Sequence, residues 1–531
     1  MESQILVKFD QNISLWKELP SGKGVWRTLV GGEVAQEAMN RYQKGLQSLF
    51  IGAYLEAKAS HITRARLVQA ARDTWLWTRF HIPTVAATID PDDEGTPKLI
   101  YKPTNESGAA EWADRTFIVS YEPGLDIENL RLQLGTEKIP SEGGTQTWCH
   151  LVLDRDEGDD SVTTFGLLIR THHSPFDGLG LKILLNRYLN QVAQVLGSAG
   201  ATNGSLSWGS EAANLPPDVF HILHPSVPRP ISPNSAEEPS FTHPCYASSR
   251  SVLQGIMEVM NAPYGFKPRP SDPGWPVPAR AKLQLSNAES TRLLATIKPP
   301  VGSLNGKKYT LTHLAHAALA MTAVADNPPS VASASSWLGN LHLRNCRELL
   351  VEPYSSRGGY TGYALGISQS RLPVSLFLTD GNTVPLDKHT LVKVMRAVRD
   401  DYANLKALPD PISYMGPLSQ LYTRNIVTSA KANMLPPNNC YTFSSDGIAE
   451  RQLDSVFHDS FGNPIFELSE AFLSLNNVHP APFFRITSWK GAIELSADFN
   501  SNLVSSTEVQ IYMETWKQFM LLALELEGDD Y

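Results

Sequence analysis

Cysteine is scarce in this chain, and the four cysteines among its 531 residues are far apart: Cys149, Cys245, Cys346 and Cys440. No two of them form a Cys-x-x-Cys pair, so the common zinc-binding and redox motifs are excluded. Their wide and irregular spacing also argues against a disulfide framework. We expect all four to be small, buried side chains in a reducing compartment.

Dense basic runs and long apolar segments are missing too. The formal net charge is -9, and nucleic-acid-binding proteins usually carry a basic patch. The most apolar helical stretch, residues 311–325, is shorter than the ~20 residues that span a bilayer, and it contains His313 and His316. The N-terminus has no basic start followed by an apolar core, as a signal peptide would have. We therefore expect a cytoplasmic protein without a nucleic-acid or membrane partner.

Several short enzyme motifs are absent as well. The chain contains no P-loop, HExxH, GxGxxG or GxSxG sequence. This excludes the common NTPase, zinc-protease, dinucleotide-binding and serine-hydrolase classes.

A proline-rich stretch separates two long segments of mixed helix and strand patterns. Residues 214–280 contain closely spaced prolines, which prevent long helices and indicate an extended crossover. One local helix is expected near 252–261. The sequence predicts an α/β protein with an N-terminal domain at 1–213 and a C-terminal domain at 281–531.

Local patterns predict elements in both halves. In the first half, helical periodicity over 63–77 ends before Pro83, and 85–89 and 98–101 have the character of strands. The second half is expected to contain a strand at 283–285, a capped helix from 286, a helix at 312–325, a hairpin of 482–489 and 492–499, and a capped final helix from 505.

The clearest local unit is a hairpin that leads into a polar turn. Residues 147–153 and 162–171 have the pattern of two paired strands, and the second continues into His-His-Ser-Pro-Phe-Asp-Gly at 172–178. Beyond Gly178, apolar residues recur at helical spacing over 181–195. The pattern predicts a strand, a tight turn that carries the histidines, and a helix.

This arrangement favours acid–base chemistry. A neutral imidazole at a strand end can face a cleft and accept a proton from a hydroxyl or an amine. Asp177 lies at a helix start, where a carboxylate stabilises the turn. We therefore assign the general base to His173 and an organising role to Asp177, with His172 and Gly178 as support. A structural histidine would explain HxxxD alone, but the doubled histidine, the glycine and the flanking elements favour a functional site.

The run 172–178 resembles the HHxxxDG motif of the chloramphenicol-acetyltransferase-like superfamily. This superfamily includes peptide-synthetase condensation domains, plant BAHD acyltransferases and fungal trichothecene acetyltransferases. The two halves and the long crossover match as well, and the chain most resembles the trichothecene 15-O-acetyltransferase type. The resemblance implies two pseudo-symmetric α/β domains around a central channel, where a thioester donor and an acceptor meet at His173.

The resemblance also implies roles for distant residues. Asp177 would hold the loop through an arginine, and Arg344 lies where BAHD-like chains carry this partner; a surface arginine at a strand end is the alternative. No DFGWG motif is present, and we interpret 498–500, Asp-Phe-Asn, as a chance similarity because it lies too near the C-terminus. In the segment 442–447, the hydroxyl of Ser444 could donate to a tetrahedral oxyanion, although a capped turn is the alternative.

We therefore expect an O-acyltransferase that moves an acyl group, in the simplest case acetyl, from acyl-CoA to a hydroxyl of a small-molecule natural product. Acyl-CoA is the expected co-substrate, and we expect a monomer with no bound cofactor, no metal and no covalent intermediate. Two alternatives stay open. One is a condensation-type enzyme whose donor is attached to a carrier protein, and the other is a condensation-like scaffold that templates a cyclisation.

Overall fold

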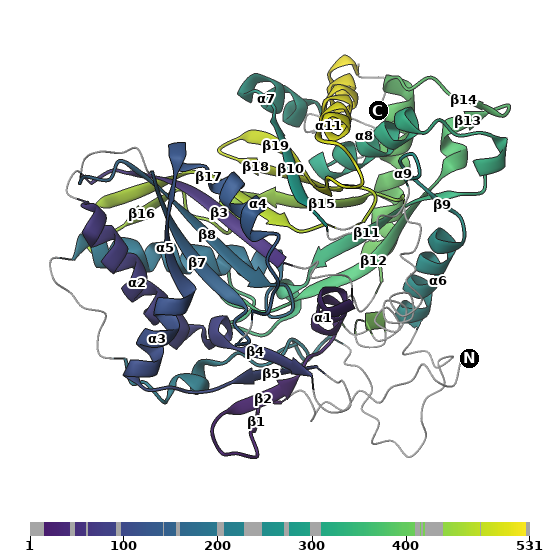
Figure 1. Ribbon diagram of the computed structural model, residues 1–531. Helices are drawn as coiled ribbons and strands as arrows, with labels where there is room; N and C mark the ends of the chain where they lie inside the picture. The colour runs from purple at the N-terminus through teal and green to yellow at the C-terminus, as the bar shows by residue number, and fades with distance from the viewer. Residues whose placement is uncertain are drawn as a thin grey trace, which may run out of the picture.

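The computed structural model describes most of the chain. The described residues are 15–42, 48–59, 62–91, 97–141, 143–154, 160–198, 206–227, 247–269, 276–297, 309–408, 412, 415, 418–419, 439–477 and 479–526. They form two neighbouring groups of strands with helices packed against them (Figure 1).

A six-stranded sheet forms the centre of the first half. Its order is β16, β17, β3, β8, β7, β6, and only β6 and β7 are parallel neighbours. The strands are Val456–His458 (β16), Pro464–Leu475 (β17), Ser48–Ala57 (β3), Thr164–His172 (β8), Thr147–Asp154 (β7) and Phe117–Glu122 (β6). Because β8 lies inside the sheet and all but its first residue are buried, it is a firm support for the turn that follows it.

Helices pack on this sheet and complete its core. They are α2 (Arg64–His81), α3 (Glu106–Thr116), α4 (Ile127–Leu134) and α5 (Gly178–Gly197), with α1 (Gly32–Tyr42) nearby (Figure 1). The predicted inner face of α5 is confirmed, since its apolar side chains from Leu181 to Val192 are buried in the same core as the β3 and β8 side chains. A smaller sheet lies beside them, with the order β1 (Lys17–Glu18), β2 (Val25–Thr28), β5 (Pro97–Tyr101) and β4 (Thr88–Pro91).

The second half has its own core. One sheet has the order β10 (Pro278–Gln284), β19 (Ala492–Asn500), β18 (Phe483–Trp489) and β15 (Thr442–Ile448), and another has the order β12 (Leu365–Pro373), β11 (Trp337–Asn345) and β9 (Pro263–Tyr264). The helices are α6 (Ala247–Asn261), α7 (Asn287–Thr296), α8 (Leu311–Asp326), α9 (Lys388–Lys406) and α11 (Ser506–Leu521). The buried α8 and α11 pack together, and Trp516 Nε1 donates to the Ala315 carbonyl at 2.8 Å. Strands β13 (Leu378–Thr379) and β14 (Asn382–Thr383) form a small hairpin.

Most of the predicted elements are present. The two hairpins, the capping boxes at Ser286 and Ser505, and the helix near 252–261 are confirmed. The strand expected at 85–89 begins only at Thr88, because Pro83–Ala86 forms a 3₁₀ turn, for which proline supplies the required φ. Three of the cysteines, Cys149, Cys346 and Cys440, are free and buried, and Cys245 lies outside the described residues.

The sheets do not follow the order of the chain. Strands β16 and β17 come from the C-terminal half of the sequence, yet β17 pairs with β3 along nearly its whole length and so extends the sheet of the first half. The C-terminal ends of β17 and β8 therefore lie along the same edge of the sheet, the one at which strands end and not the one formed by an outer strand. This edge carries the polar turn at 172–178.

Candidate active site

The turn between β8 and α5 is held by its own side chains. The chain leaves β8 at His172 and enters α5 at Gly178, and Asp177 caps the helix by accepting a hydrogen bond from the Gly180 amide at 2.7 Å. A side chain at Gly178 would collide with Leu473, because a Cβ there would lie 2.6 Å from Leu473 Cδ2. Glycine therefore allows β17 to approach the start of the helix closely.

His173 borders a cavity and has a fixed orientation. Its Nδ1 lies 2.8 Å from the Phe176 carbonyl, to which it must donate, so Nε2 is the nitrogen that can accept a proton. The residue lines a cavity of about 340 Å³ and is 8% exposed. Burial lowers the pKa of His173 below its ordinary value, although the hydrogen bond to Phe176 opposes this shift. The imidazole is therefore neutral near pH 7, as a general base must be.

His172 points away from the cavity and stabilises the turn. The Ser174 amide donates to His172 Nδ1 at 3.0 Å, and His172 Nε2 lies 3.0 Å from Glu37 Oε2 on α1. Burial would raise the pKa of Glu37, but His172 and Arg41 outweigh this effect and lower it. Glu37 is therefore an ionised partner that fixes one tautomer of His172, and α1 is tied to the turn at 172–178.

Asp177 forms a buried, bidentate ion pair, but its partner is Arg347 and not Arg344. The two Arg347–Asp177 contacts are 2.8 and 3.0 Å long, and the Ala364 amide donates to the same carboxylate at 2.8 Å. Arg347 also donates to the carbonyls of Tyr360 and Gly362. The prediction for Arg344 was wrong because β11 ends at Asn345 and the chain then enters a 3₁₀ turn, whose first residue is directed at Asp177.

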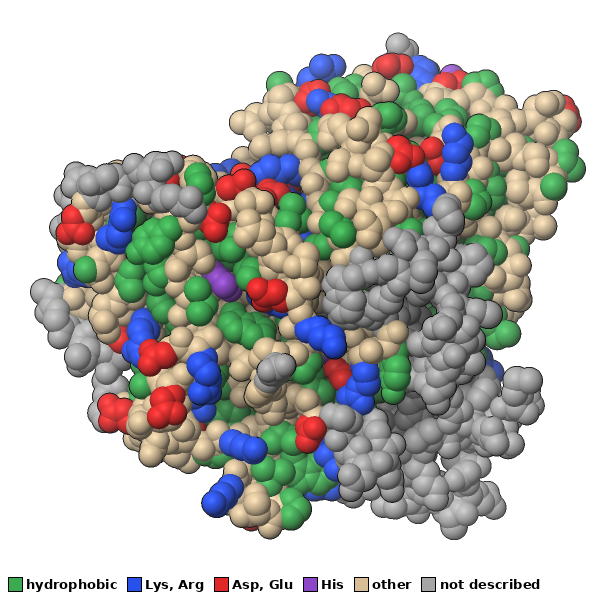
Figure 2. Space-filling model, in the orientation of Figure 1, with side chains coloured by type: hydrophobic (Ala, Val, Ile, Leu, Met, Phe, Trp, Pro, Cys, Tyr) green, Lys and Arg blue, Asp and Glu red, His purple; other side chains and the backbone are tan. Residues whose placement is uncertain are grey.

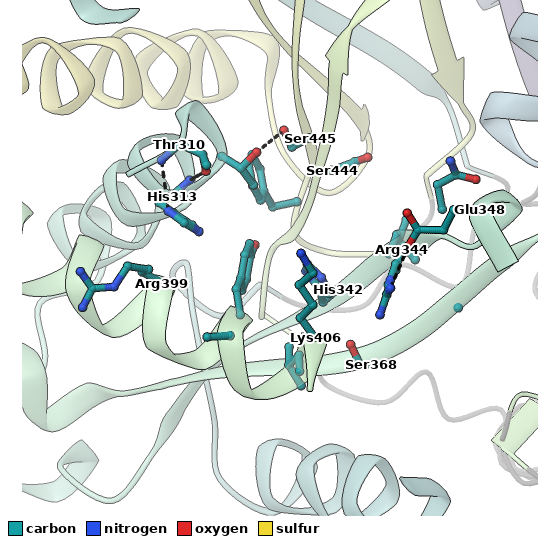
Figure 3. Close-up of a pocket in the computed structure, with 18 residues that line it drawn as sticks. Thr310, His313, His342, Arg344, Glu348, Ser368, Arg399, Lys406, Ser444 and Ser445 are labelled. Carbon is teal, nitrogen blue, oxygen red and sulfur yellow. Dashed lines mark hydrogen bonds and ion pairs between the residues drawn. The ribbon is translucent and has the colours of Figure 1, made fainter. Parts of the chain in front are cut away.

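Arg344 lies instead on the wall of a second cavity. It pairs with Glu348 at 2.8 Å, one turn further along the chain. This cavity has a volume of about 590 Å³ and lies between β11, β12, β15 and the ends of α8 and α9 (Figure 3). His313, Arg399 and Lys406 also line it, so basic and neutral polar groups surround an open space. Thr312 and Ser445 both line this cavity and are joined by a 2.7 Å hydrogen bond.

The two cavities share part of their lining. Leu343, Asn345, Ser444 and Ser445 border both of them. Ser444, the predicted oxyanion donor, is therefore close to the first cavity, and its hydroxyl donates to Asp446 Oδ1 at 2.9 Å.

A buried charge cluster surrounds Asp446. Lys182 of α5 lies 3.1 Å from Asp446, and Arg485 of β18 lies 3.3 Å from it. Burial would raise the pKa of Asp446, but the two cations hold it well below its usual range. Asp446 is therefore ionised, and this second ion pair connects α5 to β15.

Two features of the site were not predicted. Helix α1 buries a polar face of Glu33, Gln36, Glu37 and Asn40, whose spacing in the sequence is that of an ordinary solvated helix face. The loop after β17 brings His479 to the wall of the cavity that contains His173. A histidine between Val478 and Pro480 gives no local signal of such a role.

His313 and His316 have different surroundings. His316 is buried in the core, where the Tyr402 and Tyr441 hydroxyls contact its two ring nitrogens at 2.9 and 3.0 Å, so it is a packing residue. His313 instead lines the second cavity. Within the described part of the chain, no cluster of three His, Cys, Asp or Glu side chains is arranged to hold a metal ion.

Among the described helices, none is both long and apolar enough to cross a membrane. On the face seen in Figure 2, acidic and basic side chains are interspersed, and the coloured residues form no extended basic patch.

The family is shown by comparison with known proteins. A protein-family model described as 15-O-acetyltransferase Tri3 matches residues 24–341, which is more than half of the chain. The chain belongs to the Tri3 15-O-acetyltransferase family. Tri3 membership confirms the predicted enzyme class, an O-acyltransferase.

Individual relatives agree with this assignment. The trichothecene 15-O-acetyltransferase TRI3 of Fusarium sporotrichioides is 23% identical over 530 residues, which cover 95% of this chain and 96% of the relative. The structure of that enzyme matches with a TM-score of 0.80 at 20% identity, covering 98% of this chain and 100% of the other. The starter condensation domain of rhizomide synthetase RzmA, solved in complex with C8-CoA and Leu-SNAC, matches with a TM-score of 0.55 at 10% identity over 94% of each chain. The predicted α/β fold of two chloramphenicol-acetyltransferase-like units is thereby confirmed.

Proposed function

We propose that this Tri3-family protein transfers an acetyl group from acetyl-CoA to a hydroxyl of a small natural product, with His173 as the general base. The observation that carries the proposal is the contact of His173 Nδ1 with the Phe176 carbonyl at 2.8 Å. This contact leaves Nε2 unprotonated on a residue that borders a cavity large enough for a small molecule.

The reaction then needs no covalent enzyme intermediate. The acceptor hydroxyl transfers its proton to His173 Nε2 while its oxygen attacks the thioester carbonyl carbon. The resulting tetrahedral oxyanion collapses, the carbon–sulfur bond breaks, and the thiolate takes the proton back from the imidazolium. General-base catalysis of this kind contributes roughly 10²–10⁴-fold to a rate.

Ser444 is our proposed donor to the oxyanion. Its hydroxyl donates to Asp446 in the absence of substrate. Asp446 keeps Lys182 and Arg485 as partners when this hydrogen bond is given up, so the hydroxyl is free to turn toward the developing negative charge. Replacing Ser444 with alanine should therefore lower kcat more than it changes the KM for acetyl-CoA.

The second cavity suits the donor. CoA carries several phosphate charges, and the described residues that line this cavity include Arg344, Arg399 and Lys406 and a single carboxylate, Glu348. The shared wall with the His173 cavity would let the thioester arm reach the base. The condensation domain of RzmA, whose fold this chain shares, was solved with C8-CoA bound, which supports a CoA donor.

The test is an acetylation assay with matched variants. Purified protein is incubated with acetyl-CoA and a panel of alcohols that includes trichothecenes, because the relatives act on these, and products are detected by mass spectrometry. Acetylated product should form with the unaltered protein, and His173→Ala should lose at least roughly 10²-fold in kcat. His458→Ala, on an exposed position of β16, is the matched control and should be unaffected.

The alternatives give different outcomes in the same assay. Turnover only with an acyl group on a carrier protein would favour the condensation-type reaction. Unchanged product formation by His173→Ala would favour a scaffold that templates a cyclisation, and would refute the proposed role of the histidine.

A further inference from the structure

A second imidazole faces the cavity that contains His173, and the mechanism above does not use it. His479 lies in the loop between β17 and β18 and is among the residues that line the cavity. No hydrogen bond joins its ring nitrogens to another described residue, and the side chain lines the cavity. The ring is therefore open to the cavity. Burial lowers the pKa of His479, so the ring is neutral and offers one donor and one acceptor.

Hydrogen bonds connect the backbone of His479 to Asn477, and Asn477 to neighbouring strands and turns. The His479 amide donates to Asn477 Oδ1 at 3.0 Å. Asn477 Nδ2 in turn donates to the carbonyls of Ala481 and Asp498 at 2.9 and 3.2 Å. Pro480 directly follows the histidine and restricts its backbone to extended conformations. These contacts and the proline restrict the backbone of His479.

Sheet register places His479 relative to the general base. β17 and β8 lie on either side of β3, and both are antiparallel to it, so they run in the same direction and end at the same edge. His172 pairs with Ser48, and the Asn476 amide donates to the Ser48 carbonyl at 3.1 Å. The chains that carry His173 and His479 thus leave the sheet two strand spacings apart, on the order of 10 Å.

We propose that His479 is a specificity-determining residue that hydrogen-bonds a second oxygen of the acceptor, at a distance from the hydroxyl that His173 deprotonates. This inference rests on the proposed acetyl transfer. It assigns the acceptor to a chemical class, namely a small molecule that carries a second oxygen function remote from the reacting hydroxyl. A site that offers a hydrogen bond to one oxygen discriminates against the analogue that lacks it, because the bound analogue would leave the imidazole without this partner.

The first measurement uses variants at this position. With a trichothecene alcohol as the acceptor, His479→Leu should raise the acceptor KM roughly tenfold, the equivalent of one neutral hydrogen bond. The KM for acetyl-CoA should not change, and His479→Gln, which keeps a donor and an acceptor, should restore most of the loss. His458→Leu, on exposed β16, is the matched control. A purely structural role would instead alter both KM values and would not be rescued by glutamine.

The main comparison of the second measurement needs only the unaltered enzyme, so it stands even if a variant does not fold. The same trichothecene alcohol is compared with analogues from which single remote oxygens have been removed. One deoxy analogue should show the same roughly tenfold rise in KM, and His479→Leu should add nothing further with that analogue.

These experiments give different results if only the role of His479 is wrong and if acetyl transfer itself is wrong. An unchanged acceptor KM in His479→Leu, or equal KM values for all deoxy analogues, would overturn the role of His479 and leave acetyl transfer standing. A folded enzyme that acetylates no alcohol would overturn both.

Discussion

Replacing Arg347 with methionine should destabilise the protein far more than the same change at Arg344. Arg347 is buried and provides two of the four hydrogen bonds that Asp177 accepts. It also donates to the carbonyls of Tyr360 and Gly362. Removing it leaves a buried carboxylate without its counter-charge, which typically costs about 3–5 kcal/mol.

The control is the same arginine-to-methionine substitution at Arg344, whose ion pair is partly exposed to solvent. Its partner Glu348 is 64% exposed, so water and salt screen the pair, and Arg344→Met should change the free energy of unfolding by less than ~1 kcal/mol. Urea unfolding followed by tryptophan fluorescence measures both variants at equal ionic strength. The loss in Arg347→Met should persist at high salt, because the Asp177–Arg347 pair is not exposed to solvent.

A double-mutant cycle isolates the pair itself. Asp177→Asn keeps the cap on α5 but removes the charge, so the double variant Asp177→Asn with Arg347→Met should be less destabilised than the sum of the single variants. Additive single effects would refute the coupling inferred from the geometry. So would an Arg347→Met variant that is no less stable than Arg344→Met.

Three further predictions concern protonation. The acid limb of the pH profile of kcat/KM should lie below the ordinary imidazole pKa of 6.5, because burial lowers the pKa of His173; a limb above that value would contradict the assignment. Glu37→Leu should cost about 1–3 kcal/mol and lower kcat by leaving His172 Nε2 without a partner, whereas Glu37→Gln should be milder; equal unfolding midpoints in urea would contradict this. Burial raises the pKa of the Asp401 carboxyl from 3.8 to about 6, so the folded state binds the carboxyl proton more tightly than the unfolded chain does. This contribution to the free energy of unfolding is complete below pH 3.8 and is lost as the pH rises through about 6. Asp401→Asn should thus raise the melting temperature more at pH 8 than at pH 5, which thermal melts can check.

Local sequence information was sufficient to predict the turn that carries His173 and the elements on either side of it. The paired strands, the turn at 172–178 and α5 are contiguous, so periodicity and the spacing of polar residues predicted their order and the position of His173. The place of Asp177 at the helix start followed from the same local rules, because a cap depends only on its neighbours in the chain.

The remainder of the site depends on contacts between distant segments. Arg347 and Arg344 are only three residues apart, and nothing in their immediate neighbours shows which one reaches Asp177, 170 residues away. The position of His479 depends on β17 crossing into the first sheet, a pairing with β3 that no local pattern indicates. Tertiary packing, and not local propensity, decides both placements.

The two buried ion pairs explain how a site made from both halves is kept in one geometry. Asp177 of the first half is paired with Arg347 of the second, and Lys182 of the first half is paired with Asp446 of the second. The first half supplies the anion of one pair and the cation of the other. An exchange of partners would bring Asp177 to Asp446 and Lys182 to Arg347, and such contacts between like charges are strongly unfavourable in a buried site. Because Asp177 and Lys182 both lie at the start of α5, this helix is fixed against the second half at two points. The helix begins at Gly178, shortly after His173, so these contacts help to set the distance between His173 and Ser444 on β15.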